Sequence, residues 1–326
     1  MKAIVIAPSD SAPRFVEDFP EPQVNGDDQI KINVLAVAMK QLDRSNASGH
    51  HYAAQASADA QRVVGVDGVG SLADGTRVFA LGITGMMAEK AIVDKNNTVM
   101  LPKDIDLPVA AALPNAVAGS AMALRFRANI KPGDTVLING ATGVTGSCAV
   151  QIAKYYGAGR IIATGRNKQA LAALLNSGAD ETIQLNNDPT SLGQRLTEIH
   201  RATPIDIVVD YLWGSSAEVI LTTLKGNGAF THRTRYVSIG SMQGDKIQLS
   251  SEILRSADIH LTGSGMGSWT RTEVKVLITE ILPEMFKLAI DGKLYIETQT
   301  IPMQEIGNVW DIKIESGKRL VVLIPE

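Results

Sequence analysis

The sequence contains a single cysteine, Cys148, among its 326 residues, and this scarcity excludes any framework of disulfides. It also excludes a zinc site built from several thiolates. An excess of positive charge is missing as well, because the net charge is −3 and the lysines and arginines are scattered along the chain. Proteins that bind nucleic acid gather such residues into a basic stripe. We therefore expect a cytoplasmic protein without a nucleic-acid partner.

Long hydrophobic runs are a further feature that the sequence lacks. No run approaches the roughly 18 uninterrupted apolar residues that span a bilayer, so we expect no membrane partner. The N-terminal segment MKAIVIAPSD has only a handful of apolar residues before Pro8, which is too few for the core of a signal peptide. This segment is better explained as an opening strand.

The residues that are present can supply two hydrophobic cores, because 45% of the 326 residues are hydrophobic. Up to Asp106 the chain contains short β-prone runs, KAIVI, QIKINVLAVAM, TRVFAL and AEKAIVD, separated by Gly, Asp and Pro. From Thr135 onward, apolar strands alternate with helical segments, and the final strand RLVVLIP returns to the first pattern. We predict an α/β protein in which a doubly wound parallel-sheet domain at 115–263 interrupts an irregular β-rich domain formed by 1–114 and 264–326.

The segment VLINGATGVTGSCAVQIAKYYGAGRIIATG has the pattern of a strand, a glycine-rich turn, a helix and a second strand. Gly140, Gly143 and Gly146 follow the first strand directly, where glycine lets the backbone turn sharply and approach a pyrophosphate. The helix that follows offers free amide groups and its positive dipole end to phosphate. Because both flanking elements are present, the turn predicts a dinucleotide site.

The end of the second strand in such a unit selects the dinucleotide, because an acidic residue there accepts hydrogen bonds from the ribose hydroxyls of NAD. Here the strand ends in Gly165-Arg166-Asn167, without a carboxylate. The guanidinium of Arg166 suits the geometry of a 2′-phosphate, so NADPH is favoured over NADH. The alternative is that Arg166 only begins a solvated turn.

Several short segments occur in an order and spacing that together are specific. They are LDRSNASG, which contains Asp43 and Gly49, then VVGVDGVG, TRVFAL, the AALP before Asn115, KPGDTVLI, the glycine turn, GAD, DIVVD and YVSIG. In these segments the chain resembles the zinc-free quinone oxidoreductase (zeta-crystallin-like) branch of the medium-chain dehydrogenase/reductase superfamily, over nearly its full length. The resemblance implies a GroES-like substrate domain split around a Rossmann domain, which agrees with the division above.

The resemblance also implies that the catalytic metal is lost. Zinc-dependent alcohol dehydrogenases of the superfamily have a cysteine three residues before the position of Asp43 and a histidine after the glycine matched by Gly65. This chain has Lys40 and Val66 at those two positions. No spacing typical of zinc ligands is found among its histidines, which are His50, His51, His200, His232 and His260.

Without a metal, the resemblance implies conjugate reduction of a quinone or an α,β-unsaturated carbonyl, which leaves an enolate-like oxygen that needs donors and a proton. We expect Lys40 to contribute positive charge near that oxygen; the alternative is a solvated lysine at a strand end. Tyr52 falls close to a tyrosine that relatives keep at the substrate cleft, where a phenol positions the substrate or relays a proton. For Asp43 we favour a structural role in orienting the neighbouring loop, and for Asp67 bonds to backbone or to Lys/Arg partners.

For the nicotinamide end of the cofactor, the resemblance implies the segment that starts at Asn115 and the loop that contains Gly240. Two residues depart from the pattern: Gly119 stands where relatives often have threonine, and Leu185 where some have a tyrosine on the 2′-phosphate side. For Trp213, which follows the strand DIVVD, packing is favoured over recognition. The predicted cofactor-binding residues are Asn115, Gly140, Thr142, Gly143, Val144, Thr145, Gly146, Gly165, Arg166, Asn167, Gly240, Ser241, Ser264 and Gly265.

Two other functions stay open. An enoyl-thioester reductase shares the fold and the hydride chemistry, but it needs an anion-binding groove for a CoA or carrier arm, and no basic cluster in the sequence points to one. The other alternative is a catalytically silent, NADPH-binding protein of the zeta-crystallin-like type. Relatives commonly form dimers through edge strands of the Rossmann sheet, and the run ILRSADIHLTGSGM suits such an edge, so we expect a homodimer.

Overall fold

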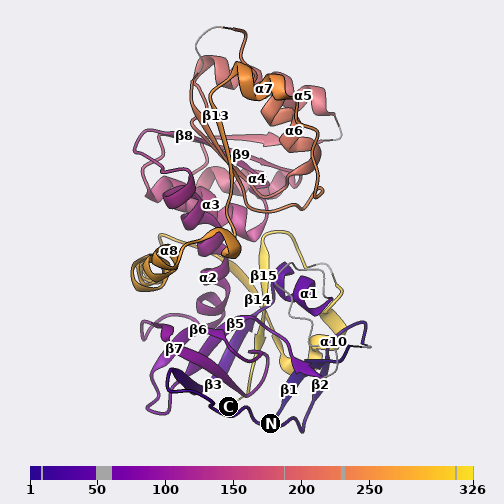
Figure 1. Cartoon of the computed structure of the whole chain (residues 1–326), viewed down its shortest axis with the longest axis vertical. Coiled ribbons are helices and arrows are strands. Elements are labelled where there is room, and N and C mark those ends of the chain that lie inside the picture. The colour runs from indigo at the N-terminus through magenta and orange to yellow at the C-terminus, as the bar shows by residue number, and fades with distance from the viewer. Residues whose placement is uncertain (9, 49–60, 187, 229–231, 313, 326) are drawn as a thin grey trace. The chain divides into compact units, whose positions relative to one another are not determined.

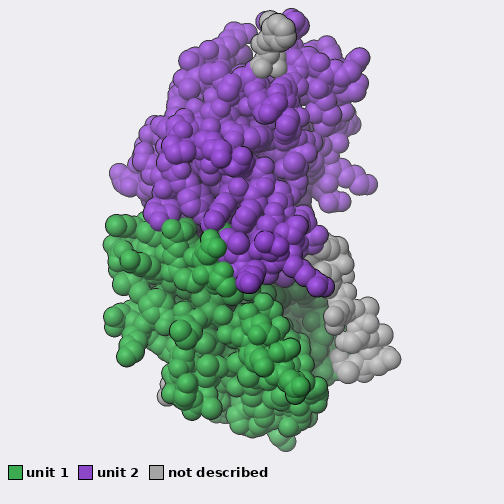
Figure 2. Space-filling model, turned by 60° about the vertical axis from the view of Figure 1, so that its left-hand side comes forward, with its two compact units in different colours: residues 1–114, 278–326 green, residues 115–277 purple. Residues whose placement is uncertain are grey.

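The structure of the chain is a computed structural model that describes residues 1–8, 10–48, 61–186, 188–228, 232–312 and 314–325. It divides into two compact units (Figure 2). Unit 1 consists of Met1–Pro114 and Ile278–Glu326, and unit 2 of Asn115–Leu277. Each unit has its own sheets and its own hydrophobic core, which is the anatomy of a domain.

Unit 1 is built mainly from antiparallel strands (Figure 1). A six-stranded sheet has the order β14-β15-β3-β5-β6-β7, and a further pairing between β3 and β7 joins its far end back to its middle. A three-stranded sheet has the order β2-β1-β4. The strands are β1 (Ala3–Ile6), β2 (Arg14–Val16), β3 (Gln29–Ala38), β4 (Arg62–Val63), β5 (Asp67–Ser71), β6 (Arg77–Gly82), β7 (Lys90–Met100), β14 (Glu297–Pro302) and β15 (Lys318–Leu323), and the helices are α1 (Gln41–Ala47), α9 (Leu282–Ile290) and α10 (Ile306–Val309).

Strand β3 shows how the sequence pattern builds this unit. Ile32, Val34 and Ala36 are buried, and they alternate along the strand with the period of two that places side chains on one face. The last strand, β15, pairs antiparallel with β3, so that Val321 lies opposite Ala38. The C-terminal strand therefore joins the sheet of the first part of the chain, as its pattern predicted.

Unit 2 contains a six-stranded sheet of order β10-β9-β8-β11-β12-β13 in which every neighbouring pair is parallel. This is the strand order of a doubly wound Rossmann fold, and it confirms the predicted fold class. The strands are β8 (Thr135–Asn139), β9 (Arg160–Gly165), β10 (Glu181–Gln184), β11 (Ile207–Asp210), β12 (Thr234–Ser238) and β13 (Ile259–Gly263), and the helices are α3 (Val144–Tyr155), α4 (Lys168–Asn176), α5 (Pro189–Ala202), α6 (Gly214–Thr223), α7 (Ser251–Ser256) and α8 (Arg271–Val276).

The central strands of this sheet are apolar along nearly their whole length because helices cover them. Leu137 of β8, Ile162 of β9 and Val208 of β11 share one core with residues of α5, α6 and α7, while α3 packs against β8 and β9. The carboxyl ends of parallel strands meet at one edge of a sheet, and the strand order reverses between β8 and β11. In folds of this kind, ligands bind at that edge near the reversal.

Helix α2 (Leu107–Met122) carries the chain from unit 1 into unit 2, with Pro114 inside it, and it continues into a π-helical turn, η1 (Ala123–Arg127). By length and composition alone, the segment from Leu107 to Arg127 could cross a membrane. However, 67% of its apolar window is buried inside the protein. Such burial is the property of a helix that belongs to a protein core.

Unit 2 extends to Leu277, beyond the boundary at residue 263 that the sequence predicted. Arg127, the last residue of η1, explains the extension. Its guanidinium donates to both carboxylate oxygens of Glu273, at 2.7 and 3.0 Å, and to the carbonyl of Ser268 at 2.6 Å. The hydrogen bonds from Arg127 lower the pKa of Glu273 to about 2. This ion pair keeps the segment 264–277 with unit 2.

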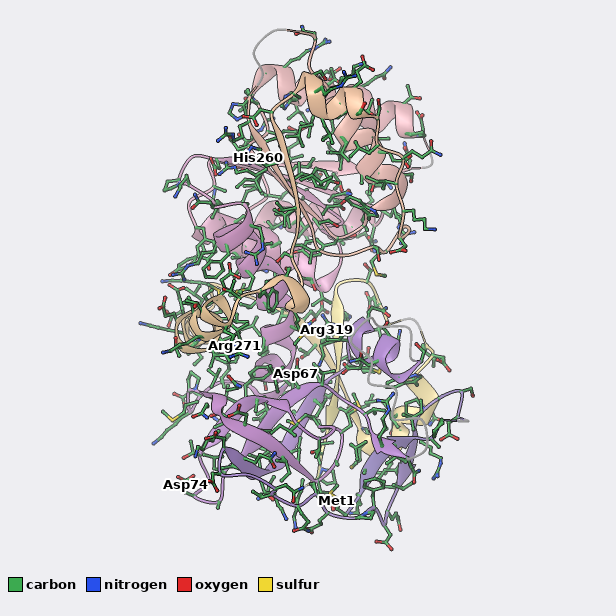
Figure 3. All side chains as sticks on the ribbon, viewed as in Figure 1. Met1, Asp67, Asp74, His260, Arg271 and Arg319 are labelled. Carbon is green, nitrogen blue, oxygen red and sulfur yellow. The ribbon has the colours of Figure 1, made fainter. Side chains whose placement is uncertain are left out.

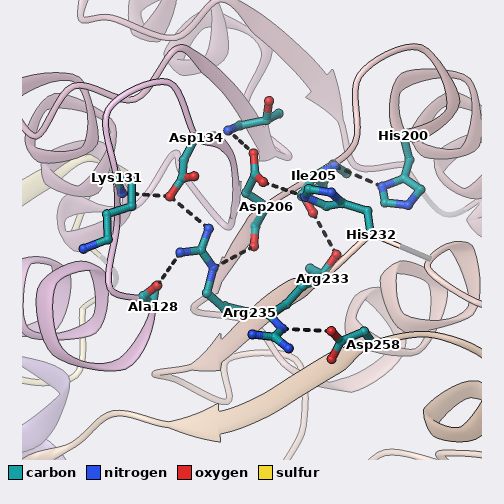
Figure 4. Close-up of polar contacts among 12 residues, drawn as sticks. Ala128, Lys131, Asp134, His200, Ile205, Asp206, His232, Arg233, Arg235 and Asp258 are labelled. Carbon is teal, nitrogen blue, oxygen red and sulfur yellow. Dashed lines mark hydrogen bonds and ion pairs between the residues drawn. The ribbon is translucent and has the colours of Figure 1, made fainter. Parts of the chain in front are cut away.

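Polar side chains join the amino-terminal ends of β8, β11 and β12 (Figure 4). Arg235 donates to the carboxylate of Asp134 at 2.9 Å and to the carbonyl of Asp206 at 3.3 Å. The side-chain carboxylate of Asp206 lies 2.6 Å from Nε2 of His232. These contacts hold the turns at this edge, which is opposite to the edge where ligands bind in such sheets.

His200, near the end of α5, is expected to make the stability of unit 2 depend on pH. Its Nδ1 accepts the N–H of Ile205 at 3.0 Å, which a protonated ring cannot do. Burial and the neighbouring His232 lower the pKa of His200 below its ordinary value, and Asp206 opposes them. Because the folded-state pKa is the lower one, this contribution to stability is fully present above about pH 6.5 and is lost as the pH falls through the folded pKa.

The variant His200→Asn keeps an acceptor but does not titrate. Between about pH 7.5 and pH 5 the wild type loses free energy of unfolding, and we expect the loss in the variant to be smaller by up to about 1 kcal/mol. Urea unfolding at the two pH values measures the difference. His260→Asn is the control, because His260 is exposed beside Asp258. Equal losses in His200→Asn and the wild type would contradict this role of His200.

Candidate functional site

The glycine turn after β8 has the backbone geometry of a dinucleotide-binding turn. Gly140 has a φ of +88°, a value that glycine adopts without strain, and a Cβ there would lie 2.8 Å from the side chain of Leu212. A Cβ on Gly146 would lie 2.4 Å from the carbonyl oxygen of Gly140. Glycine is therefore favoured at position 140 by the positive φ and the nearby Leu212, and at position 146 by the close packing of α3 on the turn.

Helix α3 begins at Val144 with Gly143 as its N-cap, and no side chain caps it. Its first turn, which contains Thr145 and Gly146, carries no acidic residue that would repel an anion. The amide groups at the start of a helix lack partners within the helix, and the helix dipole places positive charge there. The start of α3 thus fits the pyrophosphate of a dinucleotide.

The end of β9 lies against the same turn. A Cβ on Gly165 would lie 2.3 Å from the side chain of Thr142, so these two predicted residues are in contact. Asn167 accepts hydrogen bonds from the backbone of α4 at 3.0 Å, and its side chain is thereby engaged as the N-cap of that helix. Arg166 is exposed, and no side chain in the described part of the chain pairs with its guanidinium. This guanidinium is free to meet a phosphate.

A buried polar network under the turn was not predicted from the sequence. Asp210, at the carboxyl end of β11, accepts hydrogen bonds from Nδ2 of Asn139 at 2.8 Å and from the hydroxyl of Tyr236 at 2.6 Å. Thr164 donates to Oδ1 of Asn139 at 2.7 Å and accepts the N–H of Gly140 at 3.2 Å. The first glycine of the turn is therefore linked to side chains of four adjacent strands.

The segment after β11 is held by the same aspartate. Oδ1 of Asp210 also accepts the backbone N–H groups of Leu212 at 2.9 Å and Trp213 at 3.1 Å. Trp213 has a φ of 56° and a ψ of −149°, which is strained for a residue with a side chain. Its indole packs edge-on against Tyr236, with ring centroids 6.3 Å apart. This contact of Trp213 is packing within the protein, and it does not involve recognition of a ligand.

The part of α2 that belongs to unit 2 contacts the beginning of α3. The hydroxyl of Ser120 donates to the carbonyl of Thr145 at 3.1 Å and lies 3.0 Å from the hydroxyl of Tyr211. Burial raises the pKa of Tyr211, and its hydrogen bond with Ser120 opposes this only in part. Gly119 leaves room for Thr145, because a Cβ there would lie 3.0 Å from that side chain. Asn115 lies one helical turn before Gly119, on the same side of α2.

The remaining predicted cofactor residues follow β12 and β13. The N–H of Gly240 donates to the carbonyl of Asp210 at 3.3 Å, and Ser241 comes directly after it. The N–H of Ser264 donates to the carbonyl of Ser238 at 2.8 Å, and Gly265 follows. The structure therefore brings the predicted residues after β8, β9, β12 and β13 to one edge of one sheet. Their contact with a dinucleotide stays a prediction.

Lys40 belongs to unit 1 and is not the solvated lysine of the alternative interpretation, because it is only 2% exposed. Its ammonium lies 2.7 Å from Oδ1 of Asp67 and 3.3 Å from Oδ2 of Asp43, and it donates to the carbonyl of Ala38 at 2.9 Å. Oδ1 of Asp43 accepts the N–H of Val66 at 2.9 Å. The structural roles expected for Asp43 and Asp67 agree with these contacts.

The second predicted catalytic residue, Tyr52, lies outside the described residues, as do His50 and His51. Among the residues that are described, no group of three His, Cys, Asp or Glu side chains is placed to hold a metal ion. At the two positions where zinc-dependent relatives have ligands, unit 1 has the paired ammonium of Lys40 and the aliphatic side chain of Val66.

Comparisons with known proteins agree with this geometry. Residues 144–282 match the zinc-binding dehydrogenase family. The probable NADPH-dependent quinone reductase tdiC of Emericella nidulans is 28% identical over 361 residues, which cover 98% of this chain and 99% of the relative. The quinone oxidoreductase of Sus scrofa is 26% identical over 259 residues, covering 77% and 75%. The crystal structure of the quinone oxidoreductase from Thermus thermophilus, also described in complex with NADPH, has a TM-score of 0.79 at 24% identity and covers 99% of this chain and 100% of that one.

The two units and the glycine turn define a protein of the dehydrogenase and reductase class with a Rossmann fold. The matched family and these relatives support the medium-chain dehydrogenase/reductase superfamily, in its zinc-free quinone oxidoreductase branch. The resemblance inferred from the sequence is confirmed. The match to the zinc-binding dehydrogenase family lies at 144–282 and so does not include Lys40 and Val66, where the zinc ligands are replaced.

Proposed function

We propose that this protein is an NADPH-dependent reductase that transfers hydride to a quinone or an α,β-unsaturated carbonyl without a metal ion. The observation that carries the proposal is the free guanidinium of Arg166 at the end of β9, beside the glycine turn. Relatives named as an NADPH-dependent quinone reductase and as a quinone oxidoreductase support the same reaction.

The residues of unit 2 fit NADPH. Gly140 and Gly146 keep the turn compact, the first turn of α3 would hold the pyrophosphate, and Arg166 would hold the 2′-phosphate. When bound, NADPH supplies the hydride. The protein's own groups would orient the acceptor and provide a proton to its oxygen, and we assign the proton-relaying or positioning role to the phenol of Tyr52. The positive charge of Lys40 in unit 1 is paired with Asp43 and Asp67.

We further propose that the protein is a cytoplasmic homodimer. Strand β13 is the last strand of its sheet and has β12 as its neighbour among the described strands. All five of its residues are exposed or half-buried, including His260 and Thr262. A strand with a free edge is a template for pairing with a second copy of itself.

The test is the oxidation of NADPH, followed by its absorbance, with separate panels of quinones, enones and enoyl thioesters. Turnover of quinones or enones is the expected result. Turnover confined to thioesters would replace the proposal by the enoyl-thioester reductase. Binding of NADPH, seen by fluorescence, without turnover of any acceptor would make the protein a silent cofactor binder.

A further inference from the structure

The ammonium of Lys40 is enclosed by oxygens of the protein itself. A lysine ammonium has three N–H donors, and three oxygens surround this one: Oδ1 of Asp67, Oδ2 of Asp43 and the carbonyl of Ala38. The side chain of Lys40 is 1% exposed and that of Asp43 is fully buried. Any effect of Lys40 on a reaction must therefore pass through the groups that it holds.

The charges around Lys40 are balanced as a set. Lys40 and Arg319 carry two positive charges, and Asp43 and Asp67 carry two negative ones (Figure 3 labels Asp67 and Arg319). Burial disfavours the charged ammonium, but the attraction of Asp43 and Asp67 outweighs it and keeps the pKa of Lys40 above its ordinary value. Burial raises the pKa of Asp67, and Lys40 offsets this only in part. Removing either charge of the Lys40–Asp67 pair alone would leave a buried imbalance.

These contacts tie together three segments, and residues held by them line a pocket. The ammonium joins the end of β3 at Ala38 to the start of β5 at Asp67, and Asp43 joins the start of α1 to the backbone of Val66. Asp43 and Val66 themselves line a pocket of about 640 Å³ in unit 1. Its other lining residues include apolar Phe19, Pro20, Pro22 and Ile83, polar Asn46 and Thr84, and charged Glu21 and Arg62. A pocket of this size with mixed lining suits a small organic molecule.

We propose that Lys40 is a positioning residue: its ammonium, held between Asp43 and Asp67, fixes Asp43 and the Val66 backbone as one wall of the acceptor pocket. The pocket's assignment to the acceptor rests on the proposed reduction. The ammonium itself does not contact the acceptor. The acceptor class that fits is a neutral ring compound, because the apolar wall accommodates a ring and the buried cation is already neutralised.

The test compares Lys40→Met, Asp67→Asn and the double variant Lys40→Met/Asp67→Asn with the wild type. Kinetics with a quinone at saturating NADPH, over a range of pH, give kcat and KM separately, and urea unfolding gives stability. Lys40→Met leaves Asp43 and Asp67 facing each other, so we expect a roughly tenfold or larger rise in KM that lessens as the pH falls and one carboxylate takes up a proton. The double variant keeps Asp43 and Arg319 in balance, and we expect its KM to return to within about threefold of the wild type, with a flat pH profile. Lys95→Met is the matched control, because the ion pair of Lys95 with Asp28 is exposed.

A double variant that folds and binds NADPH but has the low kcat of a missing catalytic group would overturn the proposal, because Lys40 would then act on the acceptor itself. A Lys40→Met variant with unchanged KM and unfolding midpoint would overturn it as well. Should Lys40→Met fail to fold, the double variant decides alone, and its failure to fold would also count against charge balance as the role of Lys40. If the wild type reduces no acceptor, the proposed function fails, and the recovery of the urea midpoint in the double variant still tests the cluster.

Discussion

Replacing Arg166 by alanine is expected to weaken the binding of NADPH by roughly 10- to 100-fold and to leave NADH nearly unaffected, because a hydrogen bond to a charged group contributes about 1.5–3 kcal/mol. Only NADPH has the 2′-phosphate that the guanidinium would meet. Arg166 is exposed and has no side-chain partner among the described residues, so its removal leaves no buried group unpaired. Fluorescence titration with each dinucleotide measures the two dissociation constants.

Two further variants separate charge from geometry. Arg166→Lys keeps the charge but loses the planar fork, so we expect it to bind NADPH with intermediate affinity. Arg201→Ala removes an exposed arginine near the end of α5, which leads into β11 and lies toward the amino ends of the strands. This control is expected to change the affinity for NADPH by less than about twofold. Equal weakening of NADPH and NADH by Arg166→Ala would contradict the assignment of the 2′-phosphate to Arg166.

The second large effect is expected in stability: Asp210→Ala should lower the free energy of unfolding by about 3–5 kcal/mol. Asp210 is fully buried and accepts hydrogen bonds from Asn139, Tyr236, Leu212 and Trp213. Alanine leaves these donors without an acceptor in a site that water does not reach. Urea unfolding measures the loss.

The matched control for Asp210 is Asp188→Ala. Asp188 is an exposed aspartate that caps α5 by accepting the N–H of Thr190 at 2.9 Å, and its replacement is expected to cost about 1 kcal/mol. Asp210→Asn should fall between the two, because the amide keeps one acceptor oxygen. If Asp210→Ala unfolds at the same urea concentration as Asp188→Ala, the hydrogen bonds to Asp210 do not contribute the stability that we assign to them. A loss of NADPH affinity in Asp210→Asn at unchanged fold would show that the network also positions the glycine turn.

The sequence predicted those parts of the molecule that depend on local pattern. The pattern of strand and helix after Thr135 can be recognised from neighbouring residues alone, and so can the glycines Gly140 and Gly146. The absence of a carboxylate at the position of Arg166 is equally local. The return of β15 to the sheet of unit 1 followed from its apolar pattern. These features need no knowledge of which distant segments meet.

The polar interiors could not be predicted in the same way. Asn139, Thr164, Asp210 and Tyr236 are up to about a hundred residues apart, and only the parallel register of β8, β9, β11 and β12 brings them together. Lysines such as Lys40 are usually exposed to solvent, and the sequence does not show that Asp67 lies beside its ammonium. The second boundary of unit 2 was placed too early because the ion pair of Arg127 with Glu273 joins residues far apart in sequence.

The strained backbone at Trp213 has a consequence for how this position tolerates mutation. A residue with a side chain costs about 1–3 kcal/mol in such a conformation, and here the packing of the indole against Tyr236 offsets that cost. Alanine would retain the backbone cost and lose the packing, whereas glycine would lose the packing but remove the cost. Glycine should therefore be tolerated better than alanine at residue 213, which reverses the usual ranking. A substitution of Trp213 that preserves this turn is accordingly expected to be glycine rather than another small residue.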